Sequence, residues 1–371
     1  MNKELISDKQ GINLTVLFIF GSTLVIGTGG QAKNDMWIAI MLALLISVPI
    51  LMIYARILSR YPGKDLYDIL EEVFGKYLGR IFSLTFIWFS FHLGALVLRN
   101  FGEFMNTVGL PETPKIVPII MFALICALVV KSGIETLAKC SSLFIVGVFS
   151  LLFLLAFLTI PDMKSENLLP IMYNGFKPVL QGAFSAFSFP FGELVVLMMV
   201  FDSLKTPNSN YKVYLISLVI GGFIVLFIAI RNIMVLGPET IGSVYFPSYT
   251  AISRVNIGNF LQRLEITVAL VFILSGFIKI SICLLAATKG IAKLFGFKDY
   301  RILVTPVGLL MVNLAYLIYD SIMEMSEWAQ DIWPYYAFPF QVILPLLILI
   351  AVEVKAKLQK KAGQAKNEAQ V

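Results

Sequence analysis

The stretch AFSAFSFPFGELVV (183–196) places residues capable of chemistry inside a long apolar segment. Ser188, Pro190 and Gly192 lead directly to Glu193. Proline removes a backbone donor and glycine permits a sharp bend, so a helix is expected to break here. Ionisable groups within such segments usually serve function, because a buried carboxylate can hold a cation or carry a proton.

Hydrolytic and metal chemistry have little support in the sequence. The chain has one histidine and shows no metal-ligand spacing, no phosphate-binding glycine loop and no nucleophile elbow. Cys126, Cys140 and Cys283 lie within or beside apolar segments, so we expect free thiols rather than disulfides. The sequence therefore predicts a protein that is not an enzyme and that needs no cofactor or metal.

The composition indicates a polytopic membrane protein. Of 371 residues, 58% are hydrophobic and 14% are charged, with a mean hydropathy of +0.85. A soluble domain carries roughly 25% charged residues. Several apolar runs exceed the ~18–20 residues that cross a bilayer. The start MNKELISDKQ lacks a small-residue cleavage site, so the first run is expected to be a true span.

Ten membrane spans are expected, in a single domain of residues 1–358 that precedes a polar, disordered cytoplasmic tail at 359–371. The spans are predicted at 10–32, 35–58, 80–106, 115–131, 136–160, 176–202, 211–236, 262–289, 301–320 and 334–354. With the N-terminus inside, 20 of the 29 Lys and Arg lie on the cytoplasmic side and six lie outside. Both termini are then cytoplasmic, and the net charge of +6 reflects topology rather than nucleic-acid binding.

A connection after the second span has its own pattern. In PGKDLYDILEEVFGKYLG (62–79), apolar residues from Leu66 to Tyr77 repeat at helical spacing, with acidic residues on the opposite side. This pattern predicts a short amphipathic helix on the cytoplasmic membrane surface.

The first span contains a second weak point, FGSTLVIGTGG (20–30). We favour a break at Gly21, Ser22 and Thr23, which leaves two half-helices of about nine residues. Breaks in spans one and six of ten indicate a five-plus-five inverted repeat, about 10–160 and 176–354, with a ligand site near the midplane. The alternative is that Gly and Pro are simply common in membrane helices. The ligand-binding residues predicted at the breaks are Gly21, Ser22, Thr23, Phe187, Ser188, Phe189, Pro190 and Gly192.

The order of these elements resembles the amino acid–polyamine–organocation transporters with the LeuT-type fold. Within that superfamily the chain looks most like the B subunits of bacterial spore germinant receptors. The resemblance rests on FGSTLV with QAKNDMWIAI, on RYPGKDLYDILEEVFGKYLG, on FSFPFGE and on RLEI with SGFIKISI, and it covers nearly the whole chain. It implies a sensor of a small nutrient in the spore inner membrane, with partner A and C subunits.

The resemblance also brings the first, sixth and eighth helices together. Glu193 and Lys279 lie about 16 and 17 residues below the outer ends of their spans, so we expect them to pair. Lys279 could instead, or in addition, replace the cation that sodium-coupled relatives bind, with carbonyls of the broken first helix as its partners. Loss of one partner would leave a buried charge, at a cost of about 3–5 kcal/mol.

Three other intramembrane residues have open roles. His92 could line the cavity as a ligand-binding or proton-relay group, or a neighbouring carbonyl could satisfy it. Arg99 and Arg231 could guide an anionic ligand or snorkel to the interface, and for Arg231 we favour snorkelling or an outer-loop carboxylate partner. Phe187, Phe189 and Phe191 could close over a ligand or merely pack.

Two functions follow from these features. The first is a ligand-sensing subunit that binds a small nutrient, an amino acid or a sugar, at the broken helices. The second is a proton-coupled amino-acid transporter that uses Glu193, His92 or Lys279 as its titrating group. A purely structural subunit is disfavoured, because the broken-helix features are all present.

Overall fold

The computed structural model of the chain describes residues 4–206, 209–255 and 264–368, with side chains to residue 359. Within these ranges the fold is helical, and an isolated parallel bridge between Ile6 and Leu204 is its strand-like feature. The principal helices are α1 (Asp8–Phe20), α2 (Thr23–Ile26), α3 (Met36–Arg60), α4 (Leu66–Phe104), α5 (Ile116–Ser132), α6 (Ile134–Thr159), α7 (Phe176–Ala186), α8 (Asn210–Leu236), α11 (Ile266–Phe295), α12 (Arg301–Leu317), α14 (Trp333–Phe338) and α15 (Leu344–Glu368).

Shorter elements connect these helices or complete them. They are η1 (Gly30–Asp35), η2 (Met105–Gly109), η3 (Ile160–Asp162), η4 (Ser165–Leu168), η5 (Phe187–Phe191), η6 (Gly192–Met199), η7 (Phe201–Ser203), α9 (Pro238–Ile241), α10 (Pro247–Ser253), α13 (Ile322–Glu327), η9 (Trp328–Ile332) and η10 (Pro339–Ile343).

The chain is a multi-pass integral membrane protein. Eight helical stretches of the described residues are long and apolar enough to cross a membrane, and α5 and α12 are shorter apolar helices. Together they correspond to the ten predicted spans. The first residues of the predicted eighth span, 262–263, lie outside the described residues.

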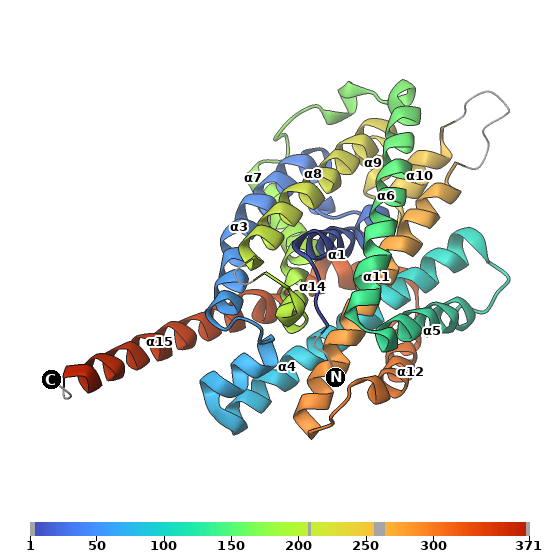
Figure 1. The fold of residues 1–371 in the computed structure, drawn as a ribbon. Helices are drawn as coiled ribbons and strands as arrows, with labels where there is room; N and C mark the ends of the chain where they lie inside the picture. The colour runs from blue at the N-terminus through green and yellow to red at the C-terminus, as the bar shows by residue number, and fades with distance from the viewer. Residues whose placement is uncertain (1–3, 207–208, 256–263, 369–371) are drawn as a thin grey trace.

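The broken segments lie inside the bundle, and other helices surround them. In the stretch Phe176–Met199, 89% of the most apolar 18 residues are buried. In the stretch Ile134–Asp162, the corresponding share is 17%. A helix with apolar side chains left uncovered by protein presents them to lipid, as α6 does. In Figure 1, α1 runs through the middle of the molecule between α8 and α11, both of which it contacts.

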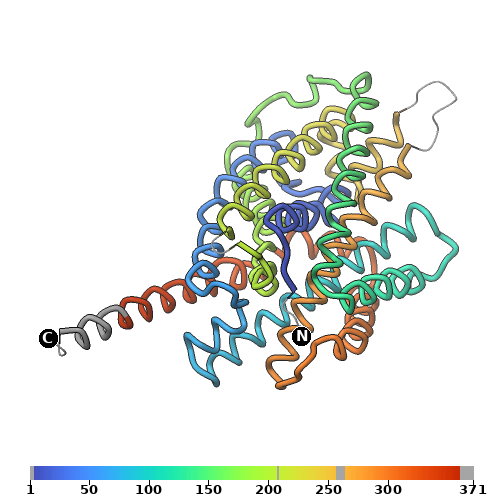
Figure 2. Tube along the Cα trace, viewed as in Figure 1, coloured from blue at the N-terminus to red at the C-terminus, as the bar shows by residue number. Residues whose placement is uncertain are grey.

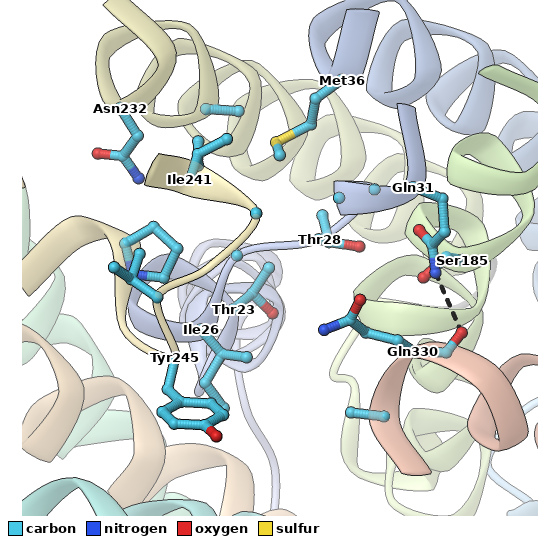
Figure 3. A pocket seen from close by; sticks show the side chains of 18 of the residues that line it. Thr23, Ile26, Thr28, Gln31, Met36, Ser185, Asn232, Ile241, Tyr245 and Gln330 are labelled. Carbon is cyan, nitrogen blue, oxygen red and sulfur yellow. Dashed lines mark hydrogen bonds between the residues drawn. The ribbon is translucent and has the colours of Figure 1, made fainter. Parts of the chain in front are cut away.

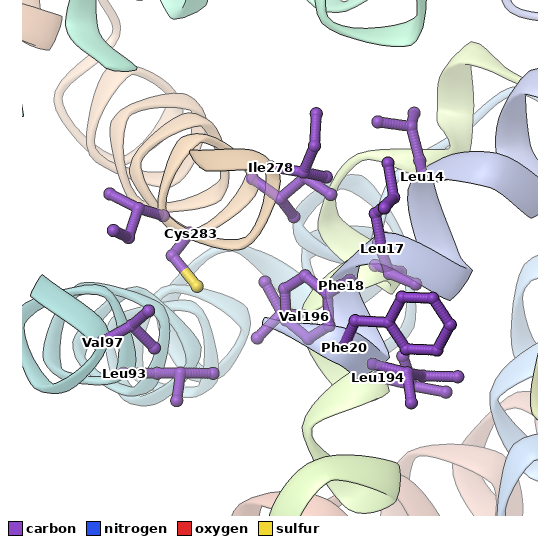
Figure 4. Close-up of a cluster of buried hydrophobic side chains, with 14 of the residues drawn as sticks. Leu14, Leu17, Phe18, Phe20, Leu93, Val97, Leu194, Val196, Ile278 and Cys283 are labelled. Carbon is purple, nitrogen blue, oxygen red and sulfur yellow. The ribbon is translucent and has the colours of Figure 1, made fainter. Parts of the chain in front are cut away.

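The centre is held by apolar side chains from segments far apart in sequence. Figure 4 shows Leu17 and Phe18 of α1 beside Leu194 of η6, with Ile278 of α11 and Val97 of α4 around them. All are buried. This packing fixes the position of both broken segments relative to α11.

The first break lies where the sequence predicted it. α1 ends at Phe20, and Gly21 adopts φ 30° and ψ −118°, a conformation that residues with a Cβ strongly disfavour. The outer half, α2, has four residues instead of the predicted nine or so. It is short because Gly27 and Gly29 also take positive φ and end the helix.

The second break is confirmed in the sixth span. α7 ends at Ala186 and passes into the π-helical segment η5, in which Phe189 has φ −132° and ψ 109°. Pro190 has no amide hydrogen to donate at this point. The chain then continues in the 3₁₀ segment η6, so the span is interrupted rather than merely bent.

The predicted amphipathic helix forms, and much of its apolar face packs on protein. It begins at Leu66 and is interrupted at Gly75, where φ is 77°. Leu66, Ile69 and Leu70 are buried in the protein core, and the Tyr67 hydroxyl donates to Ala286 O of α11 at 2.9 Å. The first turns of the apolar face therefore pack on protein, whereas Tyr77 at its end is 85% exposed, and the position at the membrane surface stays a prediction.

The C-terminal segment differs from the expected disordered tail. α15 is helical without a break from Leu344 to Glu368, which includes residues 359–368 of that tail. Lys, Gln, Ala and Glu dominate this stretch and favour helix. Figure 2 shows α15 leaving the helical body. The last tail residues, 369–371, lie outside the described residues.

Residues 4–7, which we call the N-terminal strap, cross the end of the sixth span. Ile6 N donates to Ser203 O at 2.8 Å, and Lys205 N donates to Ile6 O at 2.9 Å. Glu4 accepts from Arg301 at 2.5 Å and from the Ile134 amide at 2.8 Å. The strap therefore joins the sixth span to the helices α6 and α12 on the side of the molecule where α1 begins.

Candidate functional site

A cavity of about 630 Å³ lies between the two broken helices (Figure 3). Its volume is typical of sites for small organic ligands. The rim is formed by the segments 27–34 and 238–247 and by residues 325–330 of α13 and η9, at helix ends opposite the strap. Its polar lining consists mainly of neutral side chains, namely Thr23, Thr28, Gln31, Asn34, Asn100, Ser185, Asn232, Ser243, Ser326 and Gln330.

A smaller cavity of about 40 Å³ adjoins the first. Asn100 and Phe189 line both, whereas Glu193 and Ser22 line only the smaller one. Phe189, at the break of the sixth span, therefore lies where the large neutral cavity meets a small space that includes a carboxylate.

Side chains of the protein already bond to the carbonyls freed at the sixth break. Thr28 Oγ1 donates to Phe189 O at 2.7 Å, and Gln341 Nε2 donates to Ser188 O at 2.9 Å. The Tyr54 hydroxyl lies 3.4 Å from Gly192 O. The shorter bond of that hydroxyl goes to Gln341 O at 2.5 Å, so Thr28 and Gln341 are the donors that replace helical hydrogen bonds here, as a low-dielectric interior requires.

The first break is satisfied in the same way. Ser275 Oγ lies 2.9 Å from Gly21 O and 2.6 Å from Val271 O, so its one proton is shared between these carbonyls, and the Ser248 hydroxyl donates to Leu24 O. At these carbonyls the protein takes the place that we expected a ligand to occupy. The polar groups that the cavity offers are chiefly side-chain hydroxyls and amides.

The structure brings only part of the predicted ligand set to the cavities. Thr23 and Phe189 line the large cavity, and Ser22 lines the small one. The Thr23 hydroxyl is buried without a hydrogen-bond partner among the described residues. The remaining predicted residues at the breaks, which line neither cavity, are Gly21, Phe187, Ser188, Pro190 and Gly192.

Packing explains why those residues are excluded. A Cβ at Gly21 would lie 2.4 Å from Lys279 Cδ, and a Cβ at Gly192 would lie 2.4 Å from Gln341 Oε1. At these two positions glycine therefore lets the side chains of Lys279 and Gln341 lie close to the backbone. Phe187 belongs to the buried core, so it packs against other side chains and does not cover the cavity.

Glu193 and Lys279 form an ion pair with 2.5 Å between Oε2 and Nζ. Their side chains are 1% and 0% exposed, so the pair is fully removed from solvent. The Lys279 ammonium also lies 5.2 Å from the centre of the Phe18 ring and 4.9 Å from that of Phe189. It therefore contacts both broken segments. The Gly21 carbonyl that we expected as a partner bonds to Ser275 instead.

His92 lies outside the lining of both cavities, so its role in ligand binding stays a prediction without support from the cavity geometry. Its Nδ1 is 2.9 Å from the Tyr336 hydroxyl, which also accepts from Trp88 Nε1 at 2.8 Å. The ring stacks on Trp88 at 5.4 Å. The partner is thus a side chain of the tenth span rather than a neighbouring carbonyl.

Arg99 neither snorkels nor faces the cavities. It is buried, donates to Tyr316 O at 2.7 Å and Tyr319 O at 2.6 Å, and pairs with Glu103 at 2.8 Å. It therefore caps the end of α12, where carbonyls lack helical partners.

Arg231 also differs from the expectation. It is 2% exposed and bonds to Asn232 Oδ1 rather than to an outer-loop carboxylate among the described residues.

Sequence reasoning missed the neutral polar residues of the site. Asn100 and Asn232 line the cavity, while Thr28 and Gln341 hold the sixth break. Each lies in or beside an apolar run, and a buried amide in such a run requires a partner. That signal was present in the sequence, but the amide side chains were not singled out.

Comparison with known proteins places the chain among germination proteins. A family model described as spore germination protein matches residues 5–323. Spore germination protein KB of Bacillus subtilis (strain 168) is 31% identical, with 98% of this chain and 99% of the relative covered. The putative spore germination protein YfkT of the same organism is 26% identical, with 90% and 91% covered.

Solved structures show the same fold at low sequence identity. MhsT in complex with L-phenylalanine has a TM-score of 0.66 at 12% identity, with 95% of this chain and 99% of that chain covered. Mhp1, a nucleobase-cation-symport-1 family transporter with bromovinylhydantoin bound, has a TM-score of 0.65 at 14% identity, with 94% and 78% covered. The fold is therefore the LeuT-type five-plus-five inverted repeat with broken first and sixth helices.

Proposed function

The chain belongs to the spore germination protein family, and we propose that it is the ligand-sensing membrane subunit of a spore germinant receptor. It binds a small nutrient in the cavity between the broken helices, and binding changes the relative position of those helices. Partner subunits read that change and trigger germination.

The observation that carries this proposal is the convergence of both breaks on one cavity. Thr23 and Thr28 reach it from the first segment, and Phe189 reaches it from the sixth. The hydrogen bond from Thr28 to Phe189 O joins the two segments at the cavity wall. A ligand that contacts both segments can favour one arrangement of them over another, which is what a sensor requires.

The lining favours a ligand without net charge. Among the described residues around the two cavities, Glu193 is matched by Lys279, and Lys33 and Glu239 lie on the rim connections. Hydroxyls and amides supply both donors and acceptors. A zwitterionic amino acid meets these conditions, and it is our first choice. A sugar is the alternative, because its hydroxyl groups use the same donors and acceptors.

The partners and location follow from the family. We propose A and C subunits of the receptor as partners, the spore inner membrane as the location, and cytoplasmic termini. The excess of Lys and Arg on the strap side supports this orientation. The cavity rim then lies on the outer side, where a nutrient arrives.

The Glu193–Lys279 pair lies beside the proposed binding site and stabilises the helices that form it. We propose that Lys279 neutralises Glu193 and also occupies the place of a bound cation beside Gly21, so that the protein needs no such ion there. In this role the pair holds the sixth and eighth spans together rather than contacting the ligand directly.

One observation favours a second function, proton-coupled amino-acid transport. Glu193 lines the small cavity, so a proton that reaches this space could neutralise the carboxylate and release Lys279. A transporter needs such an intramembrane group of alterable charge.

Ligand panels and uptake assays test the two functions. Purified protein is heated with a panel of amino acids and sugars, and the true ligand should raise the unfolding temperature in a saturable manner. Proteoliposomes are then given the same ligand in radiolabelled form. Saturable binding without accumulation supports the sensor, whereas accumulation driven by a pH gradient overturns it in favour of the transporter. If every amino acid and sugar leaves the unfolding temperature unchanged, the nutrient site itself is wrong.

A further inference from the structure

The helix α15 continues beyond the part of the molecule that covers it. It is helical from Leu344 to Glu368, and Figure 2 shows it leaving the helical body. Ile348 and Val352, one turn apart, are fully buried in the core, and Val352 is the last core residue among the described side chains. Helices in proteins owe most of their stability to packing of one face, so a further surface is expected to support the end of α15.

An apolar stripe runs along the exposed side of this helix. Leu347, Ile350, Val354 and Leu358 follow one another at intervals of three or four residues, which places them on one face. Their side chains are between 49% and 62% exposed. Val354 and Leu358 come after the last core residue, so the stripe extends past the protein contacts of the helix.

The inclination of α15 keeps this stripe within reach of the bilayer. Gln341, just before α15, donates to Ser188 O at the sixth break, which in this fold lies near the membrane midplane. Leu358 lies about 25 Å further along the helix, whereas half of the hydrocarbon core measures about 15 Å. A perpendicular helix would therefore carry Leu358 out of the hydrocarbon. In Figure 1, α15 instead runs obliquely to α6 and α11, so the stripe ends at the membrane boundary.

Lysines gather where the stripe ends. After Val354 the helix contains one glutamate and five lysines, namely Lys355, Lys357, Lys360, Lys361 and Lys366. Lys355 donates to Glu72 O, whereas Lys357 is exposed and has no carboxylate partner among the described residues. The acidic residue that precedes them, Glu353, is already paired with Arg56 at 2.8 Å. The described part of the chain therefore leaves this positive charge unbalanced.

We propose that the end of α15, from Val354 onward, binds anionic phospholipids at the membrane surface opposite the cavity rim. Val354 and Leu358 enter the acyl boundary, while Lys357 extends to the phosphate groups of the lipids. Each lysine near such a surface adds about a fivefold preference for anionic lipid. A partner protein is the other occupant that such a helix could have. The oblique course along the boundary and the excess of positive charge favour lipid, and the proposal does not depend on the nutrient site.

The test measures how accessible the end of α15 is in membranes of different charge. Leu358→Cys carries a fluorophore in a Cys140→Ser background, in which Cys126 and Cys283 are buried and do not react. The full-length protein is placed in nanodiscs of phosphatidylcholine, with or without phosphatidylglycerol, and quenching by the neutral solute acrylamide is measured. We expect several-fold weaker quenching and blue-shifted emission with phosphatidylglycerol, and loss of both changes at high salt.

Lysine variants separate charge recognition from simple apolar insertion. The combined variant Lys357→Gln, Lys360→Gln and Lys361→Gln should reduce the preference for anionic lipid by about 100-fold. Its label should then be as accessible in anionic nanodiscs as in neutral ones. Lys131→Gln with Lys139→Gln, at exposed lysines of α5 and α6, is the matched control and should keep the response.

Three results would overturn the proposal. The first is a label that is equally accessible in neutral and anionic nanodiscs. The second is lipid-dependent protection that survives the loss of the three lysines. The third is protection that appears only when partner subunits are added, which would identify the end of α15 as a protein-binding surface. The exposed label and the lysines all follow the last core residue Val352, and the salt series on the labelled protein decides the matter without the lysine variants.

Discussion

The hydroxyl of Thr28 donates to the carbonyl of Phe189 at 2.7 Å, and this bond ties the two broken helices together at the wall of the cavity. The two residues are 161 positions apart in the chain. The carbonyl is free for this bond because Pro190 interrupts the sixth span. A single side chain thus replaces a helical hydrogen bond and sets the spacing of both breaks.

We expect Thr28→Val to weaken this junction. The valine keeps the volume but leaves the Phe189 carbonyl unpaired, which costs about 1–3 kcal/mol of unfolding free energy. Ligand affinity should fall as well, because Thr28 and Phe189 both line the cavity. Thermal unfolding and ligand titration measure the two effects. Thr28→Ser retains the hydroxyl and should stay close to wild type; equal losses in both variants would contradict the role of the bond.

Gly21→Ala should be strongly destabilising. Its backbone has φ 30°, and a Cβ would lie 2.4 Å from Lys279 Cδ and 3.0 Å from Phe18 O. Backbone strain and overpacking together predict a loss of about 2–5 kcal/mol. Gly147→Ala in α6 is the control, because its added Cβ would meet nothing closer than 3.9 Å. That control should match or exceed wild type in unfolding temperature, and a tolerated alanine at Gly21 would argue against the observed break.

Removal of one member of the Glu193–Lys279 pair should cost more than removal of both. Glu193→Gln or Lys279→Met leaves one buried charge unpaired, with an expected loss of about 3–5 kcal/mol. The double variant should recover a large part of this loss, and a double-mutant cycle measures the coupling. Lys64→Met removes an exposed pair with Glu72 and should cost less than about 1 kcal/mol. Additive losses at Glu193 and Lys279 would show that the pair is not coupled.

The same pair should be required for ligand response. Lys279→Met that inserts normally in the membrane should lose ligand-induced stabilisation, because the ammonium contacts both broken segments. The comparison with Lys64→Met separates this effect from a general loss of charge. A normal ligand response in Lys279→Met would dismiss both the neutralising and the cation-replacing roles.

Asp65 should give a defined dependence of stability on pH. Burial raises the pKa of its carboxyl, but Lys289 at 3.2 Å and Lys293 at 2.6 Å outweigh burial and hold the pKa below the usual value for aspartate. Because the folded pKa is the lower one, this stabilisation is complete above the unfolded pKa of about 3.9 and is lost as pH falls through the folded pKa.

The variant Asp65→Asn tests this relation. It should lose about 1–3 kcal/mol at neutral pH, because Lys289 and Lys293 lose this carboxylate while Asp202 and Asp68 still pair with them. The difference between wild type and variant should stay constant from about pH 5 to pH 8 and shrink below about pH 4. Denaturation curves across this range measure it. A difference that shrinks near neutral pH would contradict the lowered pKa.

The breaks were predictable because their causes are local. Pro190 lacks a donor wherever it stands in a span, and Gly21 is one of four glycines within ten residues of the first span. The pairing of Glu193 with Lys279 was predictable from their matched depth together with the resemblance that brings the sixth and eighth helices together, since a buried charge needs a partner at its own level. The short length of α2 was not predicted, because it depends on the conformations of Gly27 and Gly29.

The identity of the cavity lining was less accessible from sequence. Periodicity gives the depth of His92 but not which helix it faces, and its partner Tyr336 lies 244 positions away. Gln341 and Thr28 act through single bonds to carbonyls that only the folded chain brings near. The sequence thus indicates where polar groups lie along a span, whereas helix rotation decides which of them meet the ligand.

The N-terminal strap makes a shift of α1 costly on the side of the molecule where that helix begins. Residues 4–7 lead directly into α1 at Asp8, so a tilt of that helix pulls on the hydrogen bonds of Ile6 with Ser203 and Lys205. The Glu4–Arg301 pair adds an anchor on α12. A movement of α1 at this end therefore requires that these contacts break. The combined strength of the strap contacts limits how readily α1 shifts.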